Sequence, residues 1–179
     1  MTEETPLQEW PTGLVPERDG WFVVNVRDAA WAEHPSQGYI TLFENPRGKP
    51  MPELGVRVRV LKPGQMLSFY HEENAQEGFL VLAGECVLIV EGQERRLRAW
   101  DFFHSPAGTE HVLVATGDEP AAVLAVGARH DPEFLRYPVS ELAARYGASV
   151  ATETTDPDEA YAGQGEWNLG RPDGPLPWD

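Results

Sequence analysis

The stretch FLVLAGECVLIVEGQERRLRA, residues 79–99, contains two short apolar runs followed by a returning polar run. Gly84-Glu85 separates the two apolar runs, and Glu91-Gly92-Gln93-Glu94 is typical of a hairpin turn. Runs of this length that are rich in Val, Ile and Phe favour strands over helices. The stretch therefore predicts consecutive antiparallel strands.

Short apolar or alternating runs of the same kind continue on both sides of this stretch. Val56, Val58 and Val60 alternate with Arg57 and Arg59, which is the period of two that a half-buried strand shows. Further short runs that predict strands lie at residues 21–26, 38–43, 66–70, 100–104, 112–115 and 121–126. Many short strands that end in Gly or Pro turns predict an all-β sandwich or barrel.

The ends of the chain have a different composition. We expect residues 1–20 to form an N-terminal arm, residues 21–130 the β-barrel, and residues 131–179 a short helix with an extended tail. Ser140 is expected to cap the helix and Gly147 to end it. The tail contains aromatic residues, so we expect it to lie across the barrel or a partner subunit, and a disordered tail is the alternative. We expect a homodimer.

Composition excludes several classes of function. The chain has 179 residues, with 29 Asp+Glu against 14 Lys+Arg, and a formal net charge of −15. This acidity argues against nucleic-acid binding and against docking on anionic lipid. No apolar run is long enough to span a bilayer, and the acidic start Met1–Glu4 is unlike a secretory signal. Cys86 is the single cysteine, so no intrachain disulfide forms, and we expect a reducing cytoplasm.

Two segments carry residues that suit a metal. His71, Glu73 and Glu77 share the parity of one strand face, and His111 follows the turn Pro106-Ala107-Gly108. In a barrel these segments can be neighbours although they are distant in sequence. Neutral imidazoles with carboxylates suit a divalent first-row metal, with coordination positions left open for a substrate.

The spacing of these residues resembles the cupin family. The first cupin motif is Gly, a short gap, His-x-His, a few residues, Glu, six residues and Gly, to which Gly64, His71, Glu73, Glu77 and Gly84 come close. The second motif is Gly, five residues, Pro-x-Gly, two residues, His, three residues and Asn. Its spacing is kept by Trp100, Pro106-Ala107-Gly108, His111 and Ala115. The resemblance covers residues 55–127 and implies a cupin-type double-stranded β-helix, or jelly-roll barrel.

The resemblance also implies the ligands. His71, Glu77 and His111 take metal-ligand roles, and Glu73, which replaces the second His of the first motif, is either a fourth ligand or a neighbouring carboxylate. A register shifted by one residue would instead place Tyr70 and Glu72 at the two positions of the His-x-His pair. The implied cofactor is a divalent ion of Fe, Mn, Ni, Zn or Cu.

Other side chains are candidates for acid–base work or for holding a substrate. Glu73, Tyr70 and His104 are the candidate catalytic residues, although Tyr70 is expected to face away from its neighbour His71. Arg57 and Arg59 would hold an anionic substrate if their strand face is the barrel interior. If the alternating valines face the interior instead, both arginines lie at the surface, and the sequence leaves both orientations open.

Three classes of function follow. The first is a metal-dependent enzyme that acts on a small molecule, with dioxygenase-like chemistry favoured and isomerase or lyase chemistry also open. The second is a non-catalytic cupin that binds a small molecule or a metal. The third is a structural or storage cupin without a ligand. An open metal site beside a carboxylate favours the enzyme.

Overall fold

The computed structural model describes residues 3–48, 50–173 and 176–177. Within these residues strands predominate, and no helix is long and apolar enough to cross a membrane. The helices are two single turns, α1 (Glu141–Ala144) and α2 (Pro157–Ala160). The strands are β1 (Leu7–Trp10), β2 (Gly13–Pro16), β3 (Trp31–His34), β4 (Gly38–Thr41), β5 (Leu54–Leu61), β6 (Glu72–Glu73), β7 (Glu77–Ala83), β8 (Glu85–Val90), β9 (Gln93–Arg98), β10 (Phe102–Ser105), β11 (His111–Ala115), β12 (Ala121–Ala128), β13 (Leu135–Arg136) and β14 (Asn168–Leu169).

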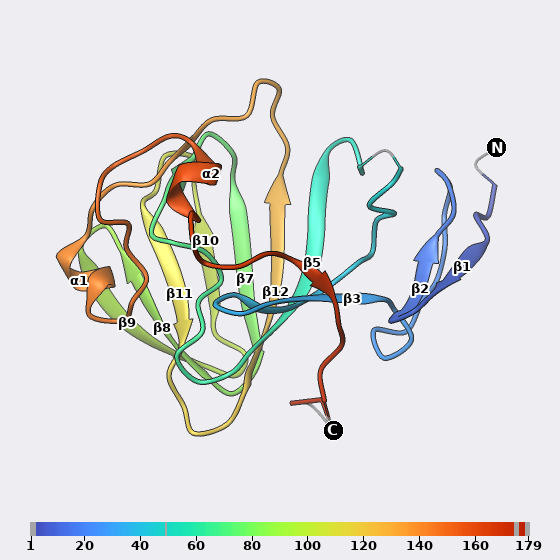
Figure 1. The fold of residues 1–179 in the computed structure, drawn as a ribbon, viewed down its shortest axis with the longest axis horizontal. Coiled ribbons are helices and arrows are strands. Elements are labelled where there is room, and N and C mark those ends of the chain that lie inside the picture. The colour runs from blue at the N-terminus through green and yellow to red at the C-terminus, as the bar shows by residue number, and fades with distance from the viewer. Residues whose placement is uncertain (1–2, 49, 174–175, 178–179) are drawn as a thin grey trace.

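Two antiparallel sheets face each other (Figure 1). The larger sheet has seven strands in the order β10-β7-β12-β5-β4-β3-β14, and the smaller has three in the order β11-β8-β9. Neighbours in space are often distant in sequence, because β12 lies between β5 and β7 and pairs with both. This arrangement confirms the expected all-β jelly-roll architecture.

The space between the two sheets is filled by apolar side chains. Leu61, Phe79 and Val123 of the larger sheet pack with Leu88 and Leu113 of the smaller one, and all five are buried. Burying one such side chain contributes about 1.5–3 kcal/mol relative to leaving it exposed. This interior cluster therefore holds the sheets together and supports the side chains at the strand ends.

The alternation of Val and Arg in β5 separates two environments. Val58 and Val60 are buried in an outer cluster with Trp31 and Tyr39. Arg59 lies opposite the interior residue Val123 in the pairing of β5 with β12, and residues opposite each other share a sheet face. The arginines of β5 are therefore on the inner face, and the valines on the outer.

The N-terminal residues form a hairpin rather than a wholly irregular arm, since β1 pairs with β2. The expected strand over residues 21–26 is wrong. Only Trp21 pairs there, through an isolated bridge with Glu4, and Val23 is 80% exposed. The Asn25 side chain accepts a hydrogen bond from the Arg27 amide, and this turn chemistry ends the extended chain before it can pair further.

The C-terminal segment is ordered and lies across the barrel of its own chain. Ser140 caps α1 as expected, because its Oγ accepts a hydrogen bond from the α1 backbone. The Ala148 carbonyl accepts from the Tyr70 amide, and the Tyr161 hydroxyl accepts from the Phe69 amide. Further along, β14 pairs with β3 (Figure 1). A disordered tail is therefore excluded for the residues that the structure describes, and α2 is a second helical turn that the sequence did not predict.

Candidate metal centre

Three side chains from separate segments meet at one end of the interior. His111 begins β11, Glu77 begins β7, and His71 pairs with His111 through backbone hydrogen bonds of 2.8 and 3.1 Å. Their possible ligand atoms lie within 4.8 Å of one another. The Glu77 Oε2 atom is 3.1 Å from His111 Nε2 and 4.0 Å from His71 Nε2. The structure therefore brings together three of the four residues that the sequence analysis offered as ligands.

Backbone carbonyls fix both imidazoles. His71 Nδ1 donates to the Phe69 carbonyl at 2.8 Å, and His111 Nδ1 donates to the Thr109 carbonyl at 2.9 Å. A carbonyl can only accept, so each Nδ1 carries a proton, and in that neutral tautomer the lone pair lies on Nε2. Hydrogen bonds of this kind commonly orient metal-binding histidines. Both lone pairs thus belong to the atoms nearest Glu77.

Two atoms of the group lack a hydrogen-bond partner. His111 Nε2 and Glu77 Oε2 are buried, and neither has a hydrogen bond to any described residue although only 3.1 Å separates them. A buried polar atom left unpaired costs about 1–3 kcal/mol, so such atoms are rare. A divalent ion would satisfy both, because imidazole nitrogen and carboxylate oxygen are ligands of first-row metals. The residues present fit such an ion.

The electrostatic environment keeps His71 neutral. Burial, together with the charge of His111, lowers the pKa of His71 to about 4, although Glu77 opposes the shift. At neutral pH the His71 ring is therefore unprotonated, which is the form that binds a metal.

Glu73 lies beside this group rather than within it. The three residues whose ligand atoms converge do not include Glu73, which lies in β6. Burial, together with the charges of Glu77 and Glu133, raises the pKa of Glu73 to about 8. Its place close to Glu77 is consistent with either of its two predicted roles.

The other candidate catalytic residues lie elsewhere. Tyr70 packs in the cluster on the outer face of the smaller sheet, and its hydroxyl accepts a hydrogen bond from the Gly92 amide. His104 is exposed on the outer face of β10, opposite Gly78, whereas its neighbour Phe103 points inward and contacts the His111 ring. The structure therefore does not place Tyr70 or His104 beside the metal group.

Arg57 and Arg59 both lie on the inner face, but neither contacts the metal group directly. Arg57 forms an ion pair with the buried Glu44. Arg59 donates to the carbonyls of Gln37 and Leu67 at 2.9 and 3.1 Å, and its buried Nε has no partner among the described residues. Burial lowers the pKa of Arg59 to about 10. Both arginines therefore belong to the inner face of the larger sheet and not to the metal group.

Tyr137 is a site residue that sequence reasoning missed. Its ring is buried, and its centroid lies 5.9 Å from that of His71. Tyr161 of the tail lies edge-on to Tyr137 at the same distance. The sequence offers only a weak signal, an aromatic residue before Pro138, because Tyr137 is far from both motifs along the chain.

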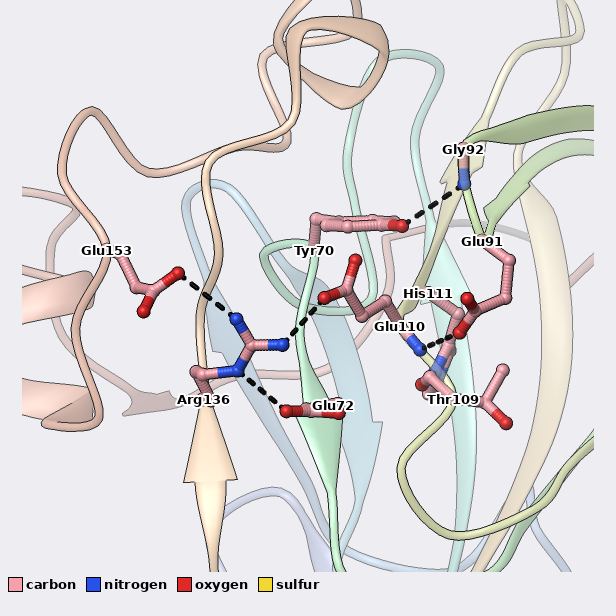
Figure 2. A network of polar contacts seen from close by, with 9 residues as sticks. All are labelled: Tyr70, Glu72, Glu91, Gly92, Thr109, Glu110, His111, Arg136 and Glu153. Carbon is pink, nitrogen blue, oxygen red and sulfur yellow. Dashed lines mark hydrogen bonds and ion pairs between the residues drawn. The ribbon is translucent and has the colours of Figure 1, made fainter.

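Arg136 holds the segment that carries Tyr137 (Figure 2). Its three side-chain nitrogens donate to Glu72 at 2.6 Å, to Glu110 at 2.7 Å and to Glu153 at 3.1 Å. Charge-assisted hydrogen bonds are stronger than neutral ones, and the planar guanidinium fixes their directions. The network therefore ties β13 to β6, to the residue before His111 and to the C-terminal segment.

Comparison with known proteins agrees with the fold and with the motifs. Residues 57–127 match a family model described as the Cupin domain. Residues 57–127 therefore form a cupin domain. No curated protein matches the chain.

Solved structures show partial likeness. A sugar phosphate isomerase from a cupin superfamily, of Silicibacter pomeroyi, is 31% identical over 50% of this chain and 59% of its own, with a TM-score of 0.46. A protein of Acidithiobacillus ferrooxidans, provisionally named a sugar phosphate isomerase, is 25% identical over 46% of this chain and 55% of its own, with a TM-score of 0.45. This chain thus matches less than two thirds of either protein, and neither likeness supports an activity.

Proposed function

We propose that this cupin binds one divalent first-row metal through His71, Glu77 and His111 and is a metal-dependent, dioxygenase-like enzyme that acts on a small molecule. The observation that carries the proposal is the pair of buried, unpartnered atoms His111 Nε2 and Glu77 Oε2, which lie 3.1 Å apart. Such a pair is costly unless a proton or a cation lies between the two atoms, and a divalent ion would satisfy both.

The surrounding residues have separate tasks in this proposal. A bound redox-active ion would supply Lewis acidity and the electron transfer that dioxygen chemistry needs. The carbonyls of Phe69 and Thr109 orient the two imidazoles. Phe79 and Phe103 pack against the His111 ring at centroid distances of 5.3 and 5.5 Å and exclude water from that side. Glu73 is the candidate for moving a proton to or from the substrate.

Metal stoichiometry tests the site. We expect protein purified without chelator to contain a first-row metal, and stripped protein to rebind one ion per chain in calorimetry. His111→Ala should abolish this binding, because it removes one of three protein ligands. His104→Ala is the matched control, since His104 is exposed on the outer face of β10 and should leave the stoichiometry unchanged. Full metal content in His111→Ala would refute the assignment.

Glu73→Gln separates the two roles of Glu73. If Glu73 lies outside the ligand set, the affinity for metal should fall only about 10–100-fold. Loss as complete as in Glu77→Gln would instead make Glu73 a ligand.

Reaction chemistry needs a further measurement. Oxygen uptake by the Fe(II)-loaded protein across a panel of small molecules should reveal turnover that His111→Ala lacks. Tight metal binding with no turnover on any substrate would favour the non-catalytic alternative, a cupin that binds a small molecule or a metal.

A further inference from the structure

A pocket lies on the larger sheet, away from the metal centre. It is about 540 Å³ in volume and is lined by residues of β5, β4, β3 and β14, by Trp10 of the N-terminal hairpin and by the loop after β4. Its floor is the inner face of the sheet, because Ile40 lies opposite Arg59 and Ala32 lies opposite Ile40. None of the three metal-group residues lines this pocket.

The charges at the pocket are reversed relative to the chain as a whole. The chain carries −15, but the charged residues that line the pocket in the described part of the chain are Arg57, Arg129 and Glu44. Both arginines bind the same carboxylate, so one positive charge is left over. Among the described residues, the side-chain contacts of Arg129 run through Nη2 alone, and its side chain is 33% exposed. Its Nε and Nη1 donors therefore remain for a ligand.

Two tryptophans supply apolar walls. Trp10 and Trp167 both line the pocket, and Trp167 is 42% exposed. Each indole already faces a cation: the Arg47 guanidinium lies 5.0 Å from the Trp10 centroid, and that of Arg59 lies 5.4 Å from the Trp167 centroid. No described carboxylate forms an ion pair with Arg59. Positive charge and aromatic surface are thus concentrated in one place.

We propose that this pocket binds a small organic anion with a planar, apolar body, its acidic group on Arg129 and its body against Trp10 and Trp167. A carboxylate or similar anion matches the fork of donors that a guanidinium presents. Indole faces favour flat, apolar partners. The site is separate from the metal centre and does not depend on a metal being bound.

The test uses the full-length chain and two probes that differ in charge, 1-naphthoate and its neutral counterpart 1-naphthamide. Calorimetry on chelator-treated protein should show one saturable naphthoate site. Naphthamide should bind at least about tenfold more weakly, because it makes no charge-assisted hydrogen bond. Naphthoate that fails to saturate, or naphthamide that binds equally well, would overturn the proposal.

Variants locate the probe. Arg129→Gln should weaken naphthoate binding at least about tenfold. Trp10→Leu, a change in the N-terminal hairpin away from the barrel interior, should weaken both probes, and it keeps the test valid if Arg129→Gln does not fold. Arg95→Gln is the control, since it removes the same charge from an exposed position of β9 and should have no effect.

His111→Ala separates this pocket from the metal centre. Naphthoate binding should be unchanged in that variant, which lacks a proposed metal ligand but retains the pocket. Loss of naphthoate binding in His111→Ala would place the anion at the metal centre and overturn the inference, whereas loss of metal alone would leave it intact.

Discussion

The role of each histidine depends on the strand face that it occupies and on what holds its Nδ1. His111 and His104 are close in sequence, but His111 points into the interior with Nδ1 bound to a carbonyl, and His104 points outward. The motif spacing predicted the first position, because two neighbouring turns fix where β11 begins. The spacing could not show that His104 points outward, because that depends on the adjacent Phe103, which takes the inward position of β10 and contacts the His111 ring.

Glu44 carries a prediction about pH. Burial opposes its charge, but hydrogen bonds from Arg57 and Met51 and the charges of Arg57 and Arg129 outweigh burial and lower the pKa of Glu44 below 4.5. A lowered pKa stabilises the fold above the unfolded value and ceases to do so as the pH falls through the folded value. Glu44→Gln should therefore reduce the free energy of unfolding by about 2–4 kcal/mol at neutral pH and by much less near pH 3.

Urea unfolding at the two pH values provides the measurement. Glu9→Gln, a change of the same kind at an exposed position of β1, is the control and should alter stability little at either pH. A loss of stability in Glu44→Gln that is the same at both pH values would contradict the electrostatic explanation.

Elements whose signals are local were predictable from the sequence. The alternation in β5 and the turns around Gly84 and Gly92 follow from neighbouring residues alone. β13 was not predictable, because its two residues pair with β6 across a long separation in sequence. The same cause hid Tyr137 from the candidate site: its position next to His71 depends on contacts that are distant in sequence, those of Arg136 with Glu72 and of Tyr137 with Tyr161.

The position of β13 can be tested through Arg136. Arg136→Gln removes the partner of three carboxylates, so the freed charges of Glu72, Glu110 and Glu153 should repel one another. Because the pairs are partly exposed, we expect a loss of only about 1–2 kcal/mol in unfolding free energy, smaller at high salt. Hydrogen exchange at residues 135–137 should become faster than in the Arg95→Gln control. Unchanged protection there would show that the network does not hold β13.

At the scale of the whole molecule, the chain outside the cupin domain covers surfaces that the domain leaves open. Tyr161 packs against Phe69 at a centroid distance of 5.0 Å, and Ala148 and Ala160 belong to the cluster on the outer face of the smaller sheet. Leu176 belongs to the outer cluster of the larger sheet, with Val58. The tail therefore covers apolar surface of its own barrel, and the expected homodimer stays a prediction.

Shortening the chain tests this covering role. A chain that ends at Gly147 loses the apolar contacts of Tyr161 and Leu176 and the Ala148 carbonyl that pairs with Tyr70. Each buried apolar side chain contributes about 1.5–3 kcal/mol, so the melting temperature should fall sharply. A chain that ends at Gly170 keeps β14 and loses the Leu176 contact and the hydrogen bond from Arg171 to the Arg27 carbonyl, so its fall should be much smaller. Light scattering distinguishes the cause: a lower melting temperature at unchanged mass means that the tail stabilises its own barrel, whereas a halved mass means that it joins two subunits. Unchanged melting and unchanged mass in the chain ending at Gly147 would contradict both roles.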